Sequence, residues 1–317
     1  MKKQLIHMTL FSAMTLTLAS CEEGHNDFPQ LERPPVSLTS FLDDYAPAEQ
    51  VFTVDATEEF RITGEKGMEV TFPAGSLLDG DDQPVTGEVT IRLIELYSKT
   101  DIMLSGLSTE SQGDLLESGG EFYLVAEQDG EALRLNPING QWTNNPVQVR
   151  FPVAPDNAPD MILFSGGPSD QNPEELTWIV SNDRVVGIDK GYYAFPLPDL
   201  NWTNLDKFAS YPGDRTNITV QVTSNSAGGP LDVQAWLVFN DMKSVIRMPG
   251  STTAGTGYDG LLPVGMDVTI VAIGSDASGH LYLGSKDILT AEDQTYTVHA
   301  ERVSDQEAED FMQGLNN

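Results

Sequence analysis

Alternation of apolar and polar residues with a period of two is the feature that most constrains the fold of this chain. The clearest runs are residues 89–93, 147–151, 218–222 and 296–300. Successive side chains of a strand point to opposite faces, so each run predicts a half-buried strand. Turn pairs such as Asp79-Gly80, Asp129-Gly130 and Ser278-Gly279 separate the runs, and no helical period lies between them. The pattern therefore predicts an all-β, antiparallel fold made of β-sandwiches.

The length of the chain predicts two such domains. It has 317 residues, which is more than one core usually holds. We expect a first sandwich over residues 51–153 and a second, with a terminal helix, over residues 214–317. Residues 154–213 form a connecting β segment that either extends one sandwich or bridges both. Its three strand candidates are Met161–Phe164, Leu176–Val180 and Tyr192–Leu197.

A short helix is predicted at the C-terminal end. Ser304 and Glu307 have the spacing of a capping box, in which each side chain satisfies a free amide at the helix start. Apolar residues follow at helical spacing, at Ala308, Phe311, Met312 and Leu315. We expect this apolar stripe to pack on the second sandwich. The alternative is that the same stripe binds a partner. Trp178 and Trp236 are flanked by apolar residues and are expected in the core.

The N-terminal segment has the pattern of a secretion signal. Lys2 and Lys3 precede an uncharged apolar run, Leu5 to Leu18, which is shorter than the roughly 20 residues that span a bilayer. The run ends in Leu18-Ala19-Ser20-Cys21, which resembles the bacterial lipobox, and Cys21 is the sole cysteine of the chain. The resemblance implies that residues 1–20 are removed and that Cys21 is acylated. The alternative is an ordinary signal peptide with a cysteine nearby by chance.

The segment after Cys21 bears on location. Residues 21–50 are polar and rich in proline, so they are expected to form a semi-extended tether. Glu22, and not Asp, follows the cysteine, and the acidic cluster that starts there resembles the surface-export signal of Bacteroidota lipoproteins. These resemblances imply a protein anchored by lipid in the bacterial outer membrane, facing the periplasm or the cell surface. The alternative role of the cluster is a solvated linker.

The charge balance excludes one class of partner. The chain has 48 acidic and 17 basic residues, and its net charge is −31. Such a surface repels phosphate backbones, so no nucleic-acid partner is expected. Because the acids are scattered along the whole chain, we favour adaptation to a saline habitat over a cation-binding surface as their explanation.

Part of the first sandwich resembles a known family. The segment Gly67–Leu77 is similar to the opening of the sandwich domain shared by ankyrins and netrin receptors, and glycines, prolines and strands follow in the order of that family. Residues 116–120 and 202–208 resemble segments of Bacteroidota lipoproteins that have the same arrangement. The resemblance implies contact between proteins and not catalysis. Leu163-Phe164-Ser165 lacks the histidine of the self-cleavage step found in some relatives, so that activity is not implied.

The sequence contains no recognisable catalytic set, so we expect the protein not to be an enzyme and to have no resident cofactor. A serine triad needs a histidine, and only His280 and His299 lie in the predicted sandwiches. Bound calcium is an alternative at Asp79, Asp81 and Asp82, which bring three carboxylates into one loop. That loop differs from an EF-hand at Gly80, and it lacks the Glu that closes an EF-hand loop. The other interpretation is a turn between strands.

Four aromatic residues are the candidates for ligand binding: Trp142, Trp202, Tyr192 and Tyr193. Such rings stack on sugars or enter the pocket of a partner, and the alternative is that they cover the edge of a core. The sequence favours a non-catalytic, lipid-anchored cell-envelope protein that binds a protein or an envelope component. The alternatives are a glycan-binding accessory lipoprotein of a polysaccharide uptake system and, less favoured, a glycoside hydrolase, whose paired acids the sequence cannot locate.

Overall fold

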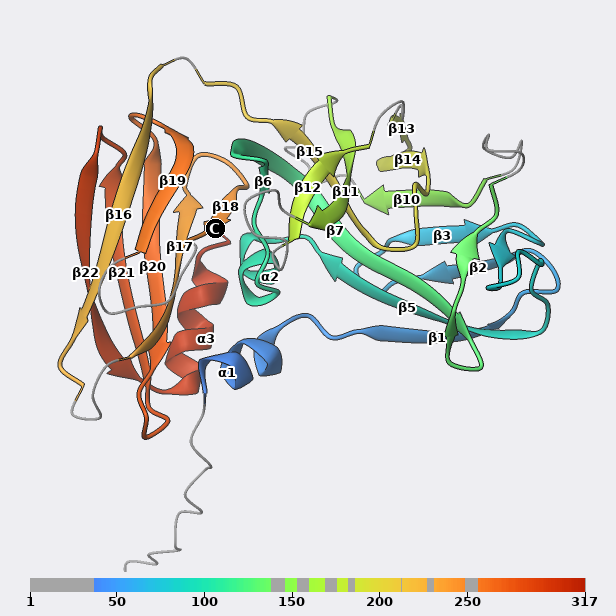
Figure 1. Ribbon diagram of the computed structural model, residues 1–317, viewed down its shortest axis with the longest axis horizontal. Coiled ribbons are helices and arrows are strands. Elements are labelled where there is room, and N and C mark those ends of the chain that lie inside the picture. Colours follow the sequence, from blue (N-terminus) through green and yellow to red (C-terminus); the bar gives the residue numbers. More distant parts are fainter. Residues whose placement is uncertain are drawn as a thin grey trace, which may run out of the picture. The chain divides into compact units, whose positions relative to one another are not determined.

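The computed structural model describes residues 37–137, 146–152, 160–168, 176–181, 186–211, 213–226, 231–248 and 256–316. In these ranges the chain is mostly β-strand in antiparallel sheets, with three short helices (Figure 1). The predicted all-β sandwich class is confirmed, and the four alternating runs lie in strands β5, β10, β16 and β22, except that Val147 directly precedes β10.

Two sheets form the first sandwich. One has the strand order β1 (Gln50–Asp55), β5 (Glu88–Leu96), β7 (Asp114–Gln128), β15 (Trp202–Phe208), β11 (Ile162–Pro168) and β12 (Leu176–Val180), and β6 (Glu110–Ser111) and β8 (Glu131–Ala132) also pair with β7. The other has the order β13 (Gly187–Asp189), β14 (Tyr192–Pro196), β10 (Gln148–Pro152), β3 (Glu69–Phe72) and β2 (Phe60–Thr63). The short strands β4 (Leu77–Leu78) and β9 (Arg134–Leu135) pair separately. The predicted connecting segment therefore extends the first sandwich.

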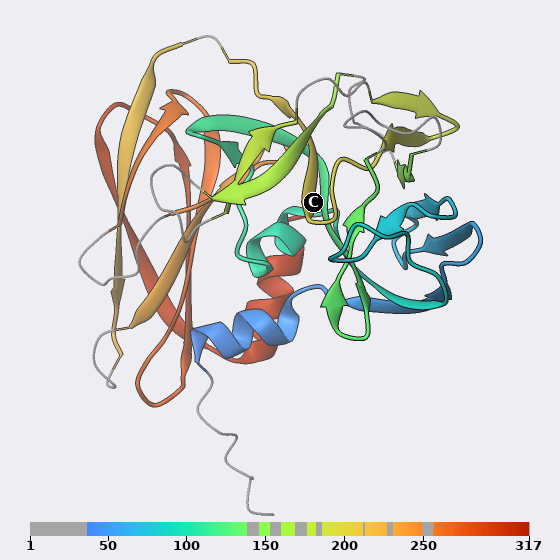
Figure 2. The same cartoon turned by 45° about the vertical axis from the view of Figure 1, so that its right-hand side comes forward.

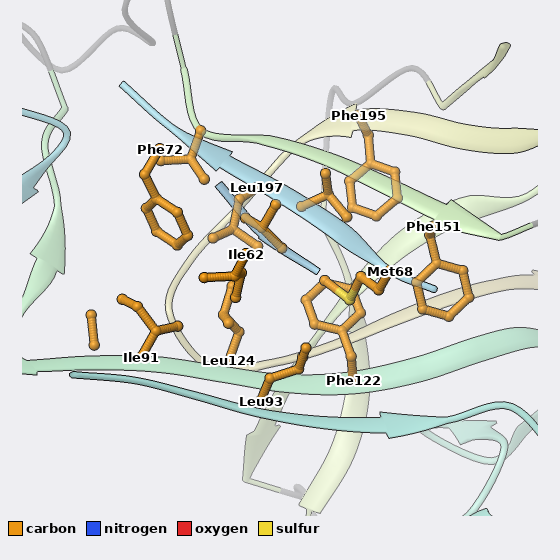
Figure 3. Close-up of a cluster of buried hydrophobic side chains, with 14 of the residues drawn as sticks. Ile62, Met68, Phe72, Ile91, Leu93, Phe122, Leu124, Phe151, Phe195 and Leu197 are labelled. Carbon is orange, nitrogen blue, oxygen red and sulfur yellow. The ribbon is translucent and has the colours of Figure 1, made fainter. Parts of the chain in front are cut away.

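The core of this sandwich comes from the alternation noted in the sequence. On β5 the side chains of Val89, Ile91 and Leu93 are buried, whereas the residues between them are more exposed. With Phe122 of the neighbouring strand β7, they face Phe151 on β10 of the opposite sheet in one apolar cluster (Figure 3). Removing these side chains from water is the main force that holds the two sheets together.

A single seven-stranded sheet forms the second sandwich. Its order is β18 (Val245–Arg247), β17 (Asp232–Phe239), β20 (Asp267–Ser275), β21 (Leu281–Leu289), β22 (Gln294–Val303), β16 (Arg215–Ser224) and β19 (Thr256–Pro263), with β16 and β22 parallel. Only three residue pairs, at residues 281–283 and 301–303, join β21 to β22. The strands before and after this short β21–β22 pairing turn side chains toward one shared core. Strand β16 contributes Val220 to that core, and β17 contributes Leu237.

A third apolar cluster is shared by both sandwiches and the three helices, α1 (Leu38–Tyr45), α2 (Lys99–Leu104) and α3 (Asp305–Gly314). It includes Trp178 from the first sandwich and Trp236 from the second, and both side chains are fully buried as predicted. Helix α1 contacts α2 and β20, while α3 contacts β21 (Figure 2). Residues 35–317 consequently form one compact unit.

The helices give one confirmation and two corrections. Helix α3 has the predicted capping box, and its Ala308 and Met312 are buried in the third cluster. The tether predicted through residue 50 is wrong for residues 38–45, because α1 forms there with Ser37 as its N-cap and Phe41 only 1% exposed. Helix α2 was not predicted, because six residues are too few for a helical period to stand out. None of the helices in the described ranges has the length and hydrophobicity that a membrane crossing requires.

Candidate functional site

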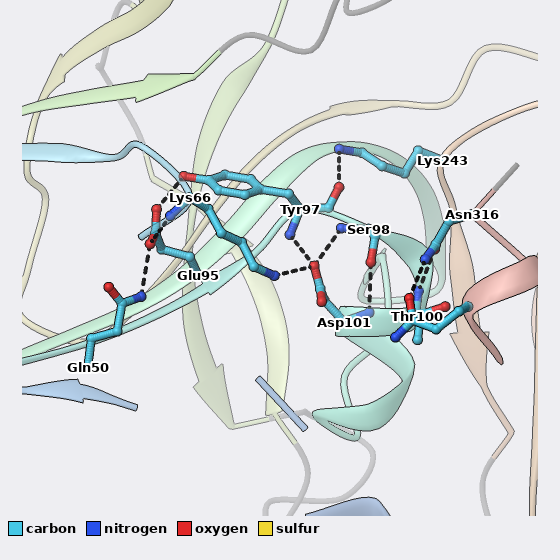
Figure 4. Close-up of polar contacts among 10 residues, drawn as sticks. Gln50, Lys66, Glu95, Tyr97, Ser98, Thr100, Asp101, Lys243 and Asn316 are labelled. Atoms are coloured by element: carbon cyan, nitrogen blue, oxygen red, sulfur yellow. Dashed lines mark hydrogen bonds and ion pairs between the residues drawn. The ribbon is translucent and has the colours of Figure 1, made fainter. Parts of the chain in front are cut away.

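The most densely bonded polar group of the first sandwich is the carboxylate of Glu95, near the end of β5. It accepts hydrogen bonds from Gln50 Nε2 at 2.9 Å, from the Tyr97 hydroxyl at 2.9 Å and from the backbone amide of Lys66 at 3.0 Å (Figure 4). The backbone amide of Met68 donates a fourth bond at 3.1 Å. Glu95 is only 1% exposed. A carboxylate has about four acceptor sites, so this one is filled by structural donors.

A second carboxylate continues this network into helix α2. Asp101 Oδ2 accepts the backbone amides of Tyr97 at 2.9 Å and Ser98 at 3.0 Å, and it pairs with Lys66 Nζ at 2.8 Å. Burial, followed by the charge of Glu95, raises the pKa of the Tyr97 hydroxyl. The network therefore joins β1, the β2–β3 turn, β5 and α2, and its acids hold local structure together.

A small cleft of about 140 Å³ lies beside the network. Gln50, Glu65, Lys66, Glu95 and Asp101 line its polar side, and residues at or just beyond the ends of α1, α2 and α3 line the rest. A water molecule occupies about 30 Å³ in the liquid, whereas ligand pockets usually measure about 300 to 1,000 Å³. The cleft has room for a few waters, and two of its three acids are committed to structural hydrogen bonds.

A separate buried polar cluster lies where β7 pairs with β15. Glu121 is opposite Asn204 and Ser118 is opposite Asp206, and all four side chains are fully buried. Asn204 Nδ2 donates to Asp206 Oδ2 at 2.8 Å. The cluster therefore joins residues 116–121 of β7 to residues 202–208 of β15.

Burial controls the ionisation of this cluster. It raises the pKa of Asp206 to about 7, against the opposing effects of hydrogen bonds from Ser118 and Asn204 and of the positive charge of Lys243. Burial, with the negative charge of Asp206, also raises the pKa of Glu121 well above its usual range. The same desolvation lowers the pKa of Lys243, whose charge the two acids favour.

Two glycines allow the strands to approach this closely. A Cβ on Gly119 would lie 2.5 Å from the carbonyl oxygen of Leu205. Gly120 has a φ of +138°, and a Cβ there would lie 2.6 Å from the Phe151 ring. A side chain at either position would displace β15 or the first core.

The structure does not bring the predicted aromatic candidates together. Cys21 and Trp142 lie outside the described residues. Trp202 on β15 is half-buried, with its ring 5.1 Å from that of Tyr123, and packs against the third cluster. Tyr192, on β14 of the opposite sheet, is half-buried under the guanidinium of Arg150 at 4.3 Å.

Tyr193 was wrongly predicted as a ligand-binding residue. Its side chain is 0% exposed and belongs to the first core, because β14 turns alternate residues inward. Of the two neighbouring tyrosines, only Tyr192 is on the solvent face of its sheet.

The calcium candidate loop is a hydrogen-bonded turn. Asp79 Oδ1 accepts the backbone amides of Asp81 and Gln83, each at 2.9 Å, and the Asp82 carboxylate pairs with Arg134. Nowhere among the described residues, this loop included, do three His, Cys, Asp or Glu side chains converge in a geometry that could hold a metal ion. The structure thus supports the turn interpretation of Asp79, Asp81 and Asp82.

Comparisons with known proteins give no family. No family model matches the chain, and no curated protein matches it. Among solved structures, the crystal structure of gamma-CGTase from an alkalophilic Bacillus clarkii matches with 13% sequence identity and a TM-score of 0.19. The match covers 79% of this chain and 41% of that one, so this chain spans less than half the length of that protein. A likeness at this level carries no argument about function.

Sequence reasoning missed the residues of both polar clusters, although a signal was present. Glu95 and Glu121 interrupt strands that are otherwise rich in apolar residues, at Ile94-Glu95-Leu96 and Gly120-Glu121-Phe122. An acid in such a setting predicts a buried partner, because an unpaired buried charge is strongly unfavourable.

Proposed function

We propose that this is a non-catalytic, lipid-anchored cell-envelope protein that binds a protein or an envelope component through the surface of its sandwiches. The observation that carries the proposal is the occupation of the Glu95 carboxylate and of Asp101 Oδ2 by structural donors beside a cleft of about 140 Å³. A general acid or base needs a lone pair or a proton that can reach a substrate. Both oxygens of Glu95 are filled in this way, and Oδ2 of Asp101 is held by two amides and an ammonium group, which supports binding over catalysis.

The outer face of the five-stranded sheet is our candidate for the binding surface. Val70, Val149 and Phe151 face the first core, so Glu69 and Arg150 face away from it.

Charged side chains form a cross-strand ladder on this face. Arg150 Nη1 lies 3.0 Å from Glu69 Oε2, and Arg150 Nη2 lies 3.7 Å from Asp189 Oδ2. Arg61 Nη1 lies 3.7 Å from the same Glu69 oxygen, and the Tyr192 ring stacks under Arg150. The arginines are notable on a chain with only 17 basic residues. Guanidinium groups and aromatic rings are enriched at binding sites, which supports the choice of this face.

Binding of a glycan is the second candidate function, and Tyr192 is the observation that favours it. Its ring is on the solvent side of β14, where a sugar can stack once Arg150 moves aside.

We expect Tyr192→Ala to weaken binding to any recognised envelope protein or polysaccharide at least tenfold, measured by calorimetry with purified components. The matched control is Tyr296→Ala on β22 of the second sandwich, which should leave the affinity unchanged. Equal affinities of wild type and Tyr192→Ala, or turnover of a polysaccharide, would contradict the proposal.

Anchoring by lipid depends on Cys21, and it predicts a clear difference in fractionation. We expect the wild-type protein in the outer-membrane fraction, and mass spectrometry of its N-terminal peptide should find acyl chains on Cys21. Two or more chains hold a protein stably on a membrane, whereas one chain gives only marginal binding. The Cys21→Ser variant should appear in the soluble fraction, with the same melting temperature as wild type because the substitution precedes the folded unit. Protease treatment of intact cells then distinguishes surface from periplasmic exposure. An unmodified Cys21 would refute the anchor.

A further inference from the structure

The cluster between β7 and β15 has an excess of hydrogen-bond acceptors. Buried atoms without a hydrogen-bond partner include both carboxylate oxygens of Glu121 and Oδ1 of Asn204. Buried polar atoms are almost always paired, since an unpaired one retains its full desolvation penalty. Several unpaired buried acceptors in one place indicate that a further hydrogen-bond donor, such as a bound proton, is present there.

A β-bulge gathers these side chains on one face. Leu205 pairs with Gly120 but Asp206 pairs with Ser118, so Gly119 is the extra residue. Phe122 and Leu205, the neighbours of the cluster residues in sequence, point into the first core. Glu121, Asn204 and Asp206 therefore face the other way, as does Leu96, which pairs with Glu121 and lies in the third cluster. The acids thus lie on the side of the first sandwich that packs against the second.

The second sandwich contributes the positive charge. Lys243, in the loop between β17 and β18, donates from Nζ to the carbonyl oxygens of Tyr97 and Gly119, each at 3.1 Å. Its own carbonyl accepts the amide of Ser118 at 2.8 Å. Lys243 is therefore bonded directly to the bulge that positions the two acids.

The other charged groups around the cluster already have partners. Glu117 on β7 pairs with Lys207 on β15 at 3.0 Å, and Asp101 on α2 pairs with Lys66. Lys99 on α2 donates to the carbonyl of Phe239 at 3.1 Å. Two buried carboxyls then face one ammonium, that of Lys243. If both acids were ionised, one negative charge would remain uncompensated in a desolvated site, and one bound proton removes it.

We propose that Glu121, Asp206 and Lys243 form a proton-dependent latch between the two sandwiches. With one proton on the acid pair, the cluster is neutral and the Lys243 loop stays bonded to the Gly119 bulge. Loss of that proton leaves a second buried carboxylate, which favours entry of water and release of the loop. The latch is thus closed in mildly acidic surroundings and loosened in alkaline ones.

The direction of the pH effect follows from the acids. An unfolded Asp or Glu has a pKa near 4, whereas in the folded protein that of Asp206 is about 7 and that of Glu121 is higher than usual. Folding therefore takes up protons, and the stability that they contribute is full below about pH 4 and is lost as the pH rises through these folded-state values. The lowered pKa of Lys243, caused by burial, acts in the opposite direction.

The test compares the full chain with Glu121→Gln, which resembles the protonated acid in shape. For wild type, raising the pH from 6 to 8.5 should lower the melting temperature by about 5 °C or more. Hydrogen exchange of the amides at residues 118–121 and 241–245, corrected for intrinsic rates, should increase at least tenfold. Glu121→Gln should lose most of both changes. Glu117→Gln, a control on the same strand, should keep them.

Three outcomes would overturn the latch. One is that Glu121→Gln and wild type respond to pH in parallel. The second is that the melting temperature changes with pH while hydrogen exchange at residues 118–121 and 241–245 does not. The contact between the Lys243 loop and the Gly119 bulge would then not respond to pH. The third is a rise in melting temperature with Ca²⁺ or Na⁺ at pH 8.5 that Glu121→Gln abolishes, because the oxygens would then bind a metal ion. If Glu121→Gln does not fold, Asp206→Asn provides the same comparison.

Discussion

Replacing Glu95 with alanine is expected to lower the free energy of unfolding by about 3–5 kcal/mol, among the largest effects of any single substitution in this chain. The change removes the acceptor of four hydrogen bonds at a site that is 1% exposed. The amides of Lys66 and Met68 and the Tyr97 hydroxyl would then lack their partner. Urea unfolding followed by tryptophan fluorescence measures the loss.

Glu65→Ala is the matched control for this substitution. Glu65 lines the same cleft, but its side chain is exposed, so its removal should change the free energy of unfolding by no more than about 0.5 kcal/mol. If Glu95→Ala and Glu65→Ala were equally mild, the carboxylate of Glu95 would not be structural. Glu95 would then be free for a role in binding or catalysis, contrary to our proposal.

Trp236→Ala is expected to destabilise both sandwiches together, by about 3–5 kcal/mol. Its side chain is 0% exposed in the third cluster, which residues of both sandwiches and all three described helices form. A cavity there weakens the packing of each half against the other. Calorimetry should therefore find one unfolding transition at a lower temperature.

Leu289→Ala serves as the control on the second sandwich. Leu289 is 67% exposed, so the substitution removes little buried apolar area. It should leave the melting temperature within a degree or two of wild type. Two separate transitions, with only the one from the second sandwich shifted by Trp236→Ala, would indicate that the halves fold independently. The third cluster would then be a weak contact.

Much of the fold could be predicted from the sequence, because strand alternation and capping are local signals. The runs around Ile91 and Val220 appear as strands, and Ser304 and Glu307 begin α3 as expected. Helix α1 could not be predicted in this way. Its Phe41 is buried against the third cluster, most of which comes from residues much later in the chain. A short helix of this kind depends on tertiary packing more than on its own propensity.

The candidate site was harder to predict, because its geometry arises from strand register. The donors to Glu95 come from residues 50, 66, 68 and 97, which meet only when β1, the β2–β3 turn and β5 are in place. Asp206 lies opposite Ser118 only because Gly119 bulges. Tyr193 failed as a candidate for a simpler reason. Two adjacent tyrosines in a strand must face opposite sides, and the sequence does not say which side is the core.

The docking of α1 has a consequence for how the chain matures. The Leu38 amide donates to Ser275 Oγ across a separation of 237 residues. The first helix of the described chain can therefore reach its final place only after nearly the whole polypeptide has emerged. Contacts between such distant positions slow folding. If the chain is exported as we propose, the place of α1 would stay open until the segment around Ser275 has followed it.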